Sequence, residues 1–100
     1  MKAFRTYQIA VSFYRMSATL QLSRPLRDQF ARASASIVLN LAEGSGRSSK
    51  ADQKRFYDIA FGSLRECQAV LDLADLTQSP TAALADTLAA HLFKLIRSRC

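Results

Sequence analysis

The sequence contains few residues that interrupt helices, with three Gly and two Pro in 100 residues. β-Branched residues are also sparse, whereas Ala and Leu are abundant. Gly, Pro and β-branched residues disfavour helices, while Ala and Leu favour them. The composition therefore predicts an all-α protein, and the length predicts a single domain over residues 1–100.

Membrane and secretion signals are missing as well. No apolar run approaches the roughly 20 residues that cross a membrane, and residues 1–6 lack the apolar segment of a secretory signal. We therefore expect a cytoplasmic protein without membrane association. The two cysteines, Cys67 and Cys100, form no metal-binding spacing, and Cys67 falls on an apolar helical seam that favours a buried, unreactive thiol.

Residues suited to catalysis are equally scarce. The single His, His91, has Leu neighbours at helical spacing, which favours a structural or surface role over catalysis. The Gly-containing stretch 43–47 follows a predicted helix rather than a strand and lacks the Lys of a phosphate-binding loop. Asp72 and Asp75 lie three residues apart, but no Glu-x-x-His segment completes a di-iron site. We therefore expect no enzymatic activity, no cofactor and no bound metal.

Apolar residues recur at helical spacing in four segments with short connections. We predict helices over about 4–22, 26–43, 50–76 and 80–98. The core stripe of the second is expected to be Phe30, Ser34, Ile37 and Leu41. Ser49 with Asp52 predicts a capping box, and Ser79 before Pro80 predicts another helix start. Gly44 is expected just past the end of the second helix, where a left-handed conformation is needed. This pattern predicts an antiparallel up-down-up-down four-helix bundle.

The first predicted helix carries two apolar stripes. One consists of Phe4, Tyr7, Val11, Tyr14 and Ala18, and the other of Ile9, Phe13, Met16 and Leu20. One stripe is enough to face the core of a bundle. The second suggests that this helix also faces another subunit. The alternative is a helix buried on two sides within one domain.

Polar residues interrupt the apolar run 36–44 of the second predicted helix. An unpaired buried polar group costs about 1–3 kcal/mol, so these residues need partners. Gly62-Ser63 in the third helix predicts the close approach of a neighbour, which we expect to be the second helix. The predicted polar network consists of Ser36, Asn40, Glu43, Ser63 and Glu66. It either fixes the register of this helix pair or forms a ligand or partner site.

Positive charge is unevenly distributed along the chain. Residues 1–55 hold ten Lys/Arg and three Asp/Glu, whereas residues 56–100 hold four and five. A basic field attracts nucleic acid or acidic partners, although a net charge of +6 is also ordinary for solubility. The candidate nucleic-acid contacts are Arg47, Lys50, Lys54 and Arg55, followed by Arg24, Arg27 and Arg32. Because no aromatic ladder for base stacking is evident, we expect contacts mainly to phosphate, with strong salt dependence.

Two spaced blocks resemble a known bacterial family. The first is Gln29-x-x-Arg32-Ala33-x-x-Ser36-Ile37-x-x-Asn40-Leu41-Ala42-Glu43-Gly44-x-x-Arg47, and the second is Arg55-Phe56-Tyr57-x-Ile59-Ala60-x-Gly62-Ser63-Leu64-x-Glu66. Both are similar to blocks of the four-helix-bundle proteins encoded in intervening sequences of 23S rRNA genes. The resemblance covers residues 26–76 well and the end helices by length and pattern. The connection at 22–25 is shorter than in many members, which often carry a Phe-Pro pair there.

The resemblance implies a cytoplasmic antiparallel bundle that assembles into a ring, commonly a homopentamer. The related accessory variability proteins of diversity-generating retroelements form basic pentameric barrels that bind a reverse transcriptase and are thought to engage nucleic acid. We therefore predict a non-enzymatic oligomer that associates with RNA or DNA, RNA being favoured, or with a ribonucleoprotein. The alternative is a structural or adaptor homo-oligomer that binds a protein partner.

Overall fold

The computed structural model describes residues 2–100, and four helices account for most of them. These are α1 (Lys2–Ser17), α2 (Arg24–Ser45), α3 (Lys50–Leu73) and α4 (Pro80–Arg97). No strand occurs within the described range, which confirms the all-α prediction. No helix in this range is both long enough and apolar enough to span a membrane.

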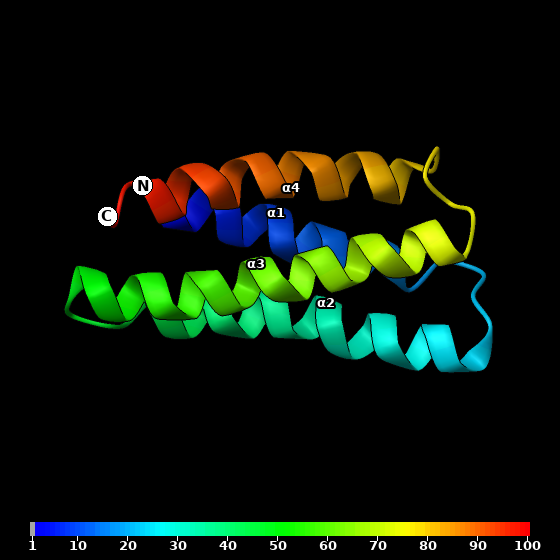
Figure 1. Cartoon of the computed structure of the whole chain (residues 1–100), viewed down its shortest axis with the longest axis horizontal. Coiled ribbons are helices and arrows are strands. Elements are labelled where there is room, and N and C mark those ends of the chain that lie inside the picture. Colours follow the sequence, from blue (N-terminus) through cyan, green and yellow to red (C-terminus); the bar gives the residue numbers. More distant parts are fainter. Residues whose placement is uncertain (1) are drawn as a thin grey trace.

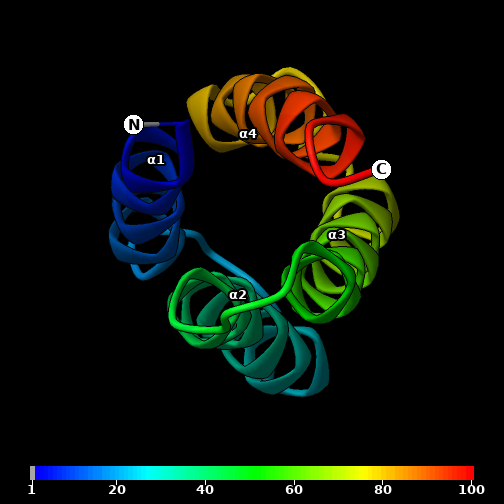
Figure 2. The ribbon, with the colours of Figure 1, turned by 90° about the vertical axis from the view of Figure 1, so that its left-hand side faces the viewer.

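The helices lie along one long axis, in a body of 40 × 21 × 18 Å. The start of α1, the α2–α3 loop and the end of α4 share one end of this body, and the other two connections share the opposite end (Figure 1). Viewed end-on, the helices form a ring in which each contacts two neighbours (Figure 2). The α2–α3 pair makes the most extensive contact of the four pairs.

The core is built from one inward stripe of each helix. On α1 the inward residues include Ile9, Ala10 and Phe13, and the Phe13 ring lies 5.7 Å from that of Phe30 on α2. The predicted inward stripe of α2, which is Phe30, Ser34, Ile37 and Leu41, is fully buried. The other α1 stripe remains largely uncovered, with Phe4 55% and Tyr14 44% exposed. One chain alone therefore leaves an apolar face along α1.

Two helices end earlier than their apolar patterns predicted. Helix α1 ends at Ser17 rather than 22, where the backbone amides of residues 18–20 bond to carbonyls three residues back and the hydroxyls of Ser17 and Thr19 do the same. Helix α3 ends at Leu73 rather than 76, because Asp75 adopts φ 60° and the Leu76 amide donates to the Leu71 carbonyl at 2.8 Å.

The prediction for Gly44 was wrong, and that for Gly62-Ser63 holds only at Ser63, which meets Ser36 of α2. Gly44 does not follow α2 in a left-handed conformation: it lies inside the helix and is buried, and Gly46 caps the end with φ −88°. Gly62 does not mark a close approach, since a Cβ there would meet nothing within 4 Å. The close approach occurs at Gly44, where a Cβ would lie 3.0 Å from the Cβ of Phe56.

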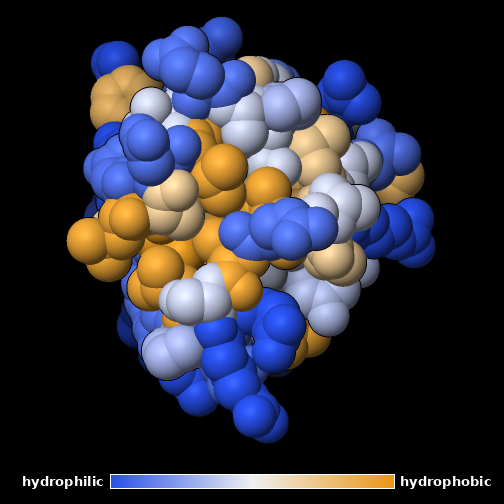
Figure 3. Space-filling view, turned by 90° about the vertical axis from the view of Figure 1, so that its right-hand side faces the viewer, coloured by the Kyte–Doolittle hydropathy of each residue, from blue (hydrophilic) through white to orange (hydrophobic). Residues whose placement is uncertain are grey.

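The end of the bundle opposite the chain termini carries exposed apolar surface (Figure 3). Leu73 is 74% exposed at the end of α3, and Leu76 beside it is half-buried. The α1–α2 connection and the start of α2 contribute the half-buried Leu20, Leu22 and Leu26. We call these five leucines the apolar end patch.

Candidate nucleic-acid interface

The positive charge of the molecule is gathered at the end that holds the chain termini. This basic end comprises residues 3–9, 36–61 and 89–100, which contain the start of α1, the α2–α3 corner and the end of α4. These segments hold eight Lys/Arg and three Asp/Glu. Residues 10–35 and 62–88 hold five of each, so the opposite half of the bundle is neutral overall.

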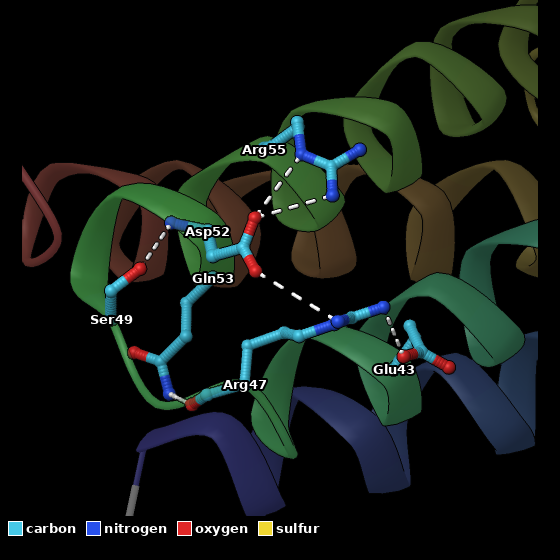
Figure 4. Close-up of polar contacts among 6 residues, drawn as sticks. All are labelled: Glu43, Arg47, Ser49, Asp52, Gln53 and Arg55. Atoms are coloured by element: carbon cyan, nitrogen blue, oxygen red, sulfur yellow. Dashed lines mark hydrogen bonds and ion pairs between the residues drawn. The ribbon is translucent and has the colours of Figure 1, made fainter.

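The α2–α3 corner of the basic end is tied together by ion pairs (Figure 4). Arg47, in the loop, lies 2.8 Å from the Glu43 carboxylate and 3.9 Å from that of Asp52. The other Asp52 oxygen accepts from Arg55 at 3.2 and 3.3 Å. Gln53 closes the loop by donating to the Arg47 carbonyl at 3.0 Å. These contacts join the loop to the end of α2 and the start of α3.

The start of α3 forms only part of the predicted capping box. Ser49 Oγ accepts from the Asp52 amide at 3.1 Å, as an N-cap should. The Asp52 carboxylate does not complete the box, because it pairs with Arg47 and Arg55 instead. The capping segment thus also positions the basic side chains of the corner.

Phe56 is the aromatic residue of this corner. The guanidinium carbon of Arg47 lies 4.8 Å from the centroid of the Phe56 ring, and that of Arg55 lies 4.5 Å from it. These distances are typical of guanidinium–aromatic stacking. The sequence shows no aromatic ladder, and this stacked arrangement of one ring with two arginines becomes visible only in the fold.

The two lysines of the predicted site differ in their surroundings. Lys54 Nζ lies 2.8 Å from Asp58 Oδ2, and this hydrogen bond, reinforced by the charge of Asp58, raises the pKa of Lys54. Lys50 is exposed and has no carboxylate within ion-pair distance in the described part of the chain. Lys50 is therefore the freer of the two cations for an external phosphate.

The fold adds basic residues to those predicted from the sequence. Arg5 from α1 and Lys94 and Arg97 from α4 lie at the same end, exposed, and none has a carboxylate within ion-pair distance among residues 2–100. Arg5 and Lys94 also line a hollow of about 160 Å³ between α1 and α4. The sequence could have revealed these residues if the charged residues near each helix end had been grouped by the bundle end that they share.

Arg99 reaches inward from the end of α4. Its Nε and the hydroxyl of the fully buried Tyr57 are both buried and make no well-formed hydrogen bond in the described structure. Burial raises the pKa of Tyr57, and the positive charge of Arg99 lowers this pKa by a smaller amount. Arg99 therefore adds positive charge beneath the basic end rather than on its surface.

The remaining predicted contacts do not join this cluster. Arg24 and Arg27 lie at the first turn of α2, and the rise of the helix places them about 27–32 Å from its other end at Ser45. Arg32 lies midway along α2, exposed, with its guanidinium 2.8 Å from Gln29 Oε1. Four of the seven predicted basic residues thus share the basic end, two lie at the opposite end, and Arg32 lies between them.

The predicted polar network is also divided. Ser36 Oγ lies 2.8 Å from Ser63 Oγ across the α2–α3 contact, and Asn40 Nδ2 donates to Ser36 Oγ at 3.1 Å and to its carbonyl at 2.9 Å. Glu43 belongs instead to the ion pairs of the corner, and Glu66 is exposed. The three residues that meet are half-buried and satisfy one another, as a register-fixing contact would.

Comparison with known proteins gives one match. The family model described as 23S rRNA-intervening sequence protein matches residues 4–98, which confirms the resemblance seen in the two sequence blocks. No curated protein and no solved structure matches the chain.

Proposed function

The chain belongs to the family of 23S rRNA-intervening sequence proteins, and from this premise we propose that it binds nucleic acid, RNA in particular, through its basic end. The observation that carries the proposal is the separation of charge, with eight Lys/Arg and three Asp/Glu in the segments of one end and five of each elsewhere. Arg5, Lys50, Lys94 and Arg97 supply positive charge that no carboxylate of the described chain pairs with. The protein acts in this proposal as a non-enzymatic, cytoplasmic component of a ribonucleoprotein.

Binding of this kind depends on salt. Each phosphate that a Lys or Arg neutralises releases condensed counterions, so log K falls with log[salt] by about 0.9 per contact for duplex DNA and about 0.7 for single strands. Four free cations thus predict a slope of about 3 to 4. Arg47, Lys54 and Arg55 should contribute less to this slope. Each already pairs with a carboxylate, so a phosphate must compete with that carboxylate for the cation.

We also propose that this up-down-up-down bundle is the protomer of a homo-oligomer, a pentamer by family resemblance. A groove between α1 and α2 supports this, with a hollow of about 250 Å³ lined by Val11, Tyr14, Ala35, Val38 and Leu39. Leu39 is 66% exposed within it. Contiguous exposed apolar surface of this kind is a feature of association sites.

Sedimentation velocity tests the assembly. We expect an oligomer at micromolar concentration, and Leu39→Glu should shift it toward monomer because a carboxylate would be buried without a partner. Leu73→Glu, at a similarly exposed Leu on the far end of the bundle, is the matched control and should leave the assembly unchanged. A wild-type monomer would refute the proposed oligomer.

The apolar end patch favours a second candidate function, an adaptor that binds a protein partner. Leu73 lies there with most of its surface exposed, in the half of the bundle that has no excess charge. A protein partner would bind this patch without competition from salt, whereas nucleic acid would bind the basic end. The two functions therefore predict different dependence on ionic strength, strong for nucleic acid and weak for the protein partner.

Salt-titrated binding to a generic single-stranded RNA and a generic duplex DNA tests the leading proposal. We expect binding at low salt that weakens by about 10²-fold between about 50 and 200 mM, as four phosphate contacts would. Absence of binding to both nucleic acids at low salt would overturn nucleic-acid association and leave the adaptor function.

A further inference from the structure

Arg47 and Arg55 place their guanidinium groups against the same aromatic ring, that of Phe56. The two carbon-to-centroid distances are 4.8 and 4.5 Å. The Arg47 side chain is nevertheless 41% exposed and that of Arg55 59% exposed. Each guanidinium is therefore supported by the ring and still accessible to a ligand.

Carboxylates occupy the edges of the same two groups. The N–H donors of a guanidinium point outward in its plane. Glu43 lies 2.8 Å from Arg47 Nη2, and Asp52 contacts Arg47 Nη1 at 3.9 Å and Arg55 Nη2 at 3.2 Å. Two carboxylates thus face two guanidinium ions, so this pair of arginines contributes little net charge to attract phosphate. These carboxylates take only part of each donor edge, and the exposed remainder of each guanidinium, beside the Phe56 ring, is open to a ligand.

We propose that the Arg47–Phe56–Arg55 cluster stacks against unpaired bases and gives the basic end a preference for single-stranded over duplex nucleic acid. Unpaired bases can stack on guanidinium planes, whereas the base faces inside a duplex are covered by neighbouring base pairs. The cations without carboxylate partners, such as Lys50 on the same corner, contact the phosphates of either form. This inference rests on the proposed nucleic-acid function and names the class of ligand that the site prefers.

Asp52 acts in this arrangement as a positioning residue. Its two oxygens contact different arginines, so it fixes both guanidinium groups with respect to one ring. Its backbone amide donates to Ser49 Oγ, which places Asp52 in the capped first turn of α3. The stacking faces are therefore oriented before a ligand binds, which lowers the entropic cost of binding.

Variants that keep charge and remove planarity test the proposal. Arg55→Lys and Arg47→Lys retain a cation at each position, and Phe56→Leu retains apolar volume. Affinity for a single-stranded RNA and for a duplex RNA of equal length is measured by fluorescence anisotropy at low salt. We expect each variant to weaken single-strand binding about 5-fold or more, as removal of one stacked base would, and to leave duplex binding unchanged.

Arg65 provides a matched control. Its guanidinium carbon lies 4.7 Å from the Phe61 ring on the same helix, and Arg65 itself falls outside the basic end. Arg65→Lys therefore changes an equivalent arginine–aromatic pair and should alter neither affinity. A single-stranded probe with 2-aminopurine should also change its fluorescence on binding wild type and change it less on binding Phe56→Leu.

The outcomes separate the stacking proposal from the proposed function. If wild type binds both RNAs but the Lys variants keep full single-strand affinity, the arginines act as charges and the stacking proposal is wrong. Equal reductions for single strand and duplex would overturn it as well. If wild type binds neither RNA, the nucleic-acid function itself fails, and the stacking proposal fails with it.

Discussion

Gly44 on α2 lies directly against the ring of Tyr57 on α3. A Cβ atom at position 44 would come within 2.7 Å of Tyr57 Cε1, closer than real Cβ contacts. Tyr57 is fully buried, so its ring cannot turn out into solvent without losing its core contacts. The α2–α3 contact, the most extensive in the bundle, thus depends on the absence of a side chain at this position.

Gly44→Ala should destabilise the protein. Added volume in a packed core typically destabilises a protein by about 1–3 kcal/mol. Replacing a helical Gly with Ala stabilises the helix by about 1 kcal/mol. We expect a net decrease in the free energy of unfolding of up to about 2 kcal/mol from these two terms. Urea unfolding followed by circular dichroism measures the change.

Gly62→Ala is the matched control for this substitution. A Cβ at position 62 would meet no atom within 4 Å, so only the helix propensity changes. This variant should gain about 0.5–1 kcal/mol. Equal changes in the two variants would show that the contact with Tyr57 does not limit packing at position 44.

The hydrogen bond between Ser36 and Ser63 should appear as a coupling energy. Ser36→Ala leaves the Ser63 hydroxyl without its 2.8 Å partner across the helix pair, at a cost of about 1 kcal/mol. The double variant removes both hydroxyls, so its destabilisation should be smaller than the sum of the two single effects by about 0.5 kcal/mol or more. Strict additivity in urea unfolding would show that the two serines are not coupled.

Cys67 should be unreactive in the folded protein. Burial raises the pKa of its thiol from 9.0 to about 12, so the reactive thiolate is absent at mildly alkaline pH. A colorimetric disulfide reagent should label one thiol, the exposed Cys100, in native protein and two in denaturant. Native Cys100→Ser protein should show no labelling; one labelled thiol in that variant would contradict the burial of Cys67.

The raised pKa of the Cys67 thiol also predicts that the free energy of unfolding falls at high pH. The folded state keeps the Cys67 proton while the unfolded state releases it above about pH 9, so unfolding is favoured progressively as pH rises toward about 12. The raised pKa of Tyr57 acts in the same direction. Cys67→Ala should show a shallower decline of the urea midpoint with pH, and an unchanged decline would exclude Cys67 as its source.

The two ends of the bundle should contribute unequally to nucleic-acid binding. Lys94→Ala with Arg97→Ala removes two cations from the basic end, and Arg24→Ala with Arg27→Ala removes two from the neutral half. The first pair should weaken binding several-fold and lower the salt slope by about 1 for each phosphate that is no longer neutralised. The second pair, which has the same net charge, should have little effect. Equal weakening by the two pairs would show that overall charge, not its position, governs binding.

Local sequence patterns predicted the elements well, because helix formation and capping depend on neighbours within a few residues. The apolar stripe of α2 and the N-cap serines Ser49 and Ser79 were all found as predicted. The helix ends at Ser17 and Leu73 were missed, since there tight backbone turns or a left-handed Asp75 redirect the chain although apolar residues continue. Gly44 was assigned to a turn because its actual constraint, the Tyr57 ring, is distant in sequence.

By itself, the sequence determined the number and type of the elements and the family, since both are carried by residue types and short spacings along the chain. The tertiary structure decided which charges act together. It divided Arg24 and Arg27 from Arg47, brought in Arg5, Lys94 and Arg97 from helices at the two ends of the chain, and set Asp52 between two arginines. The reason is geometric: helices pack side by side, so residues become neighbours by their height along the bundle axis and not by their order in the chain.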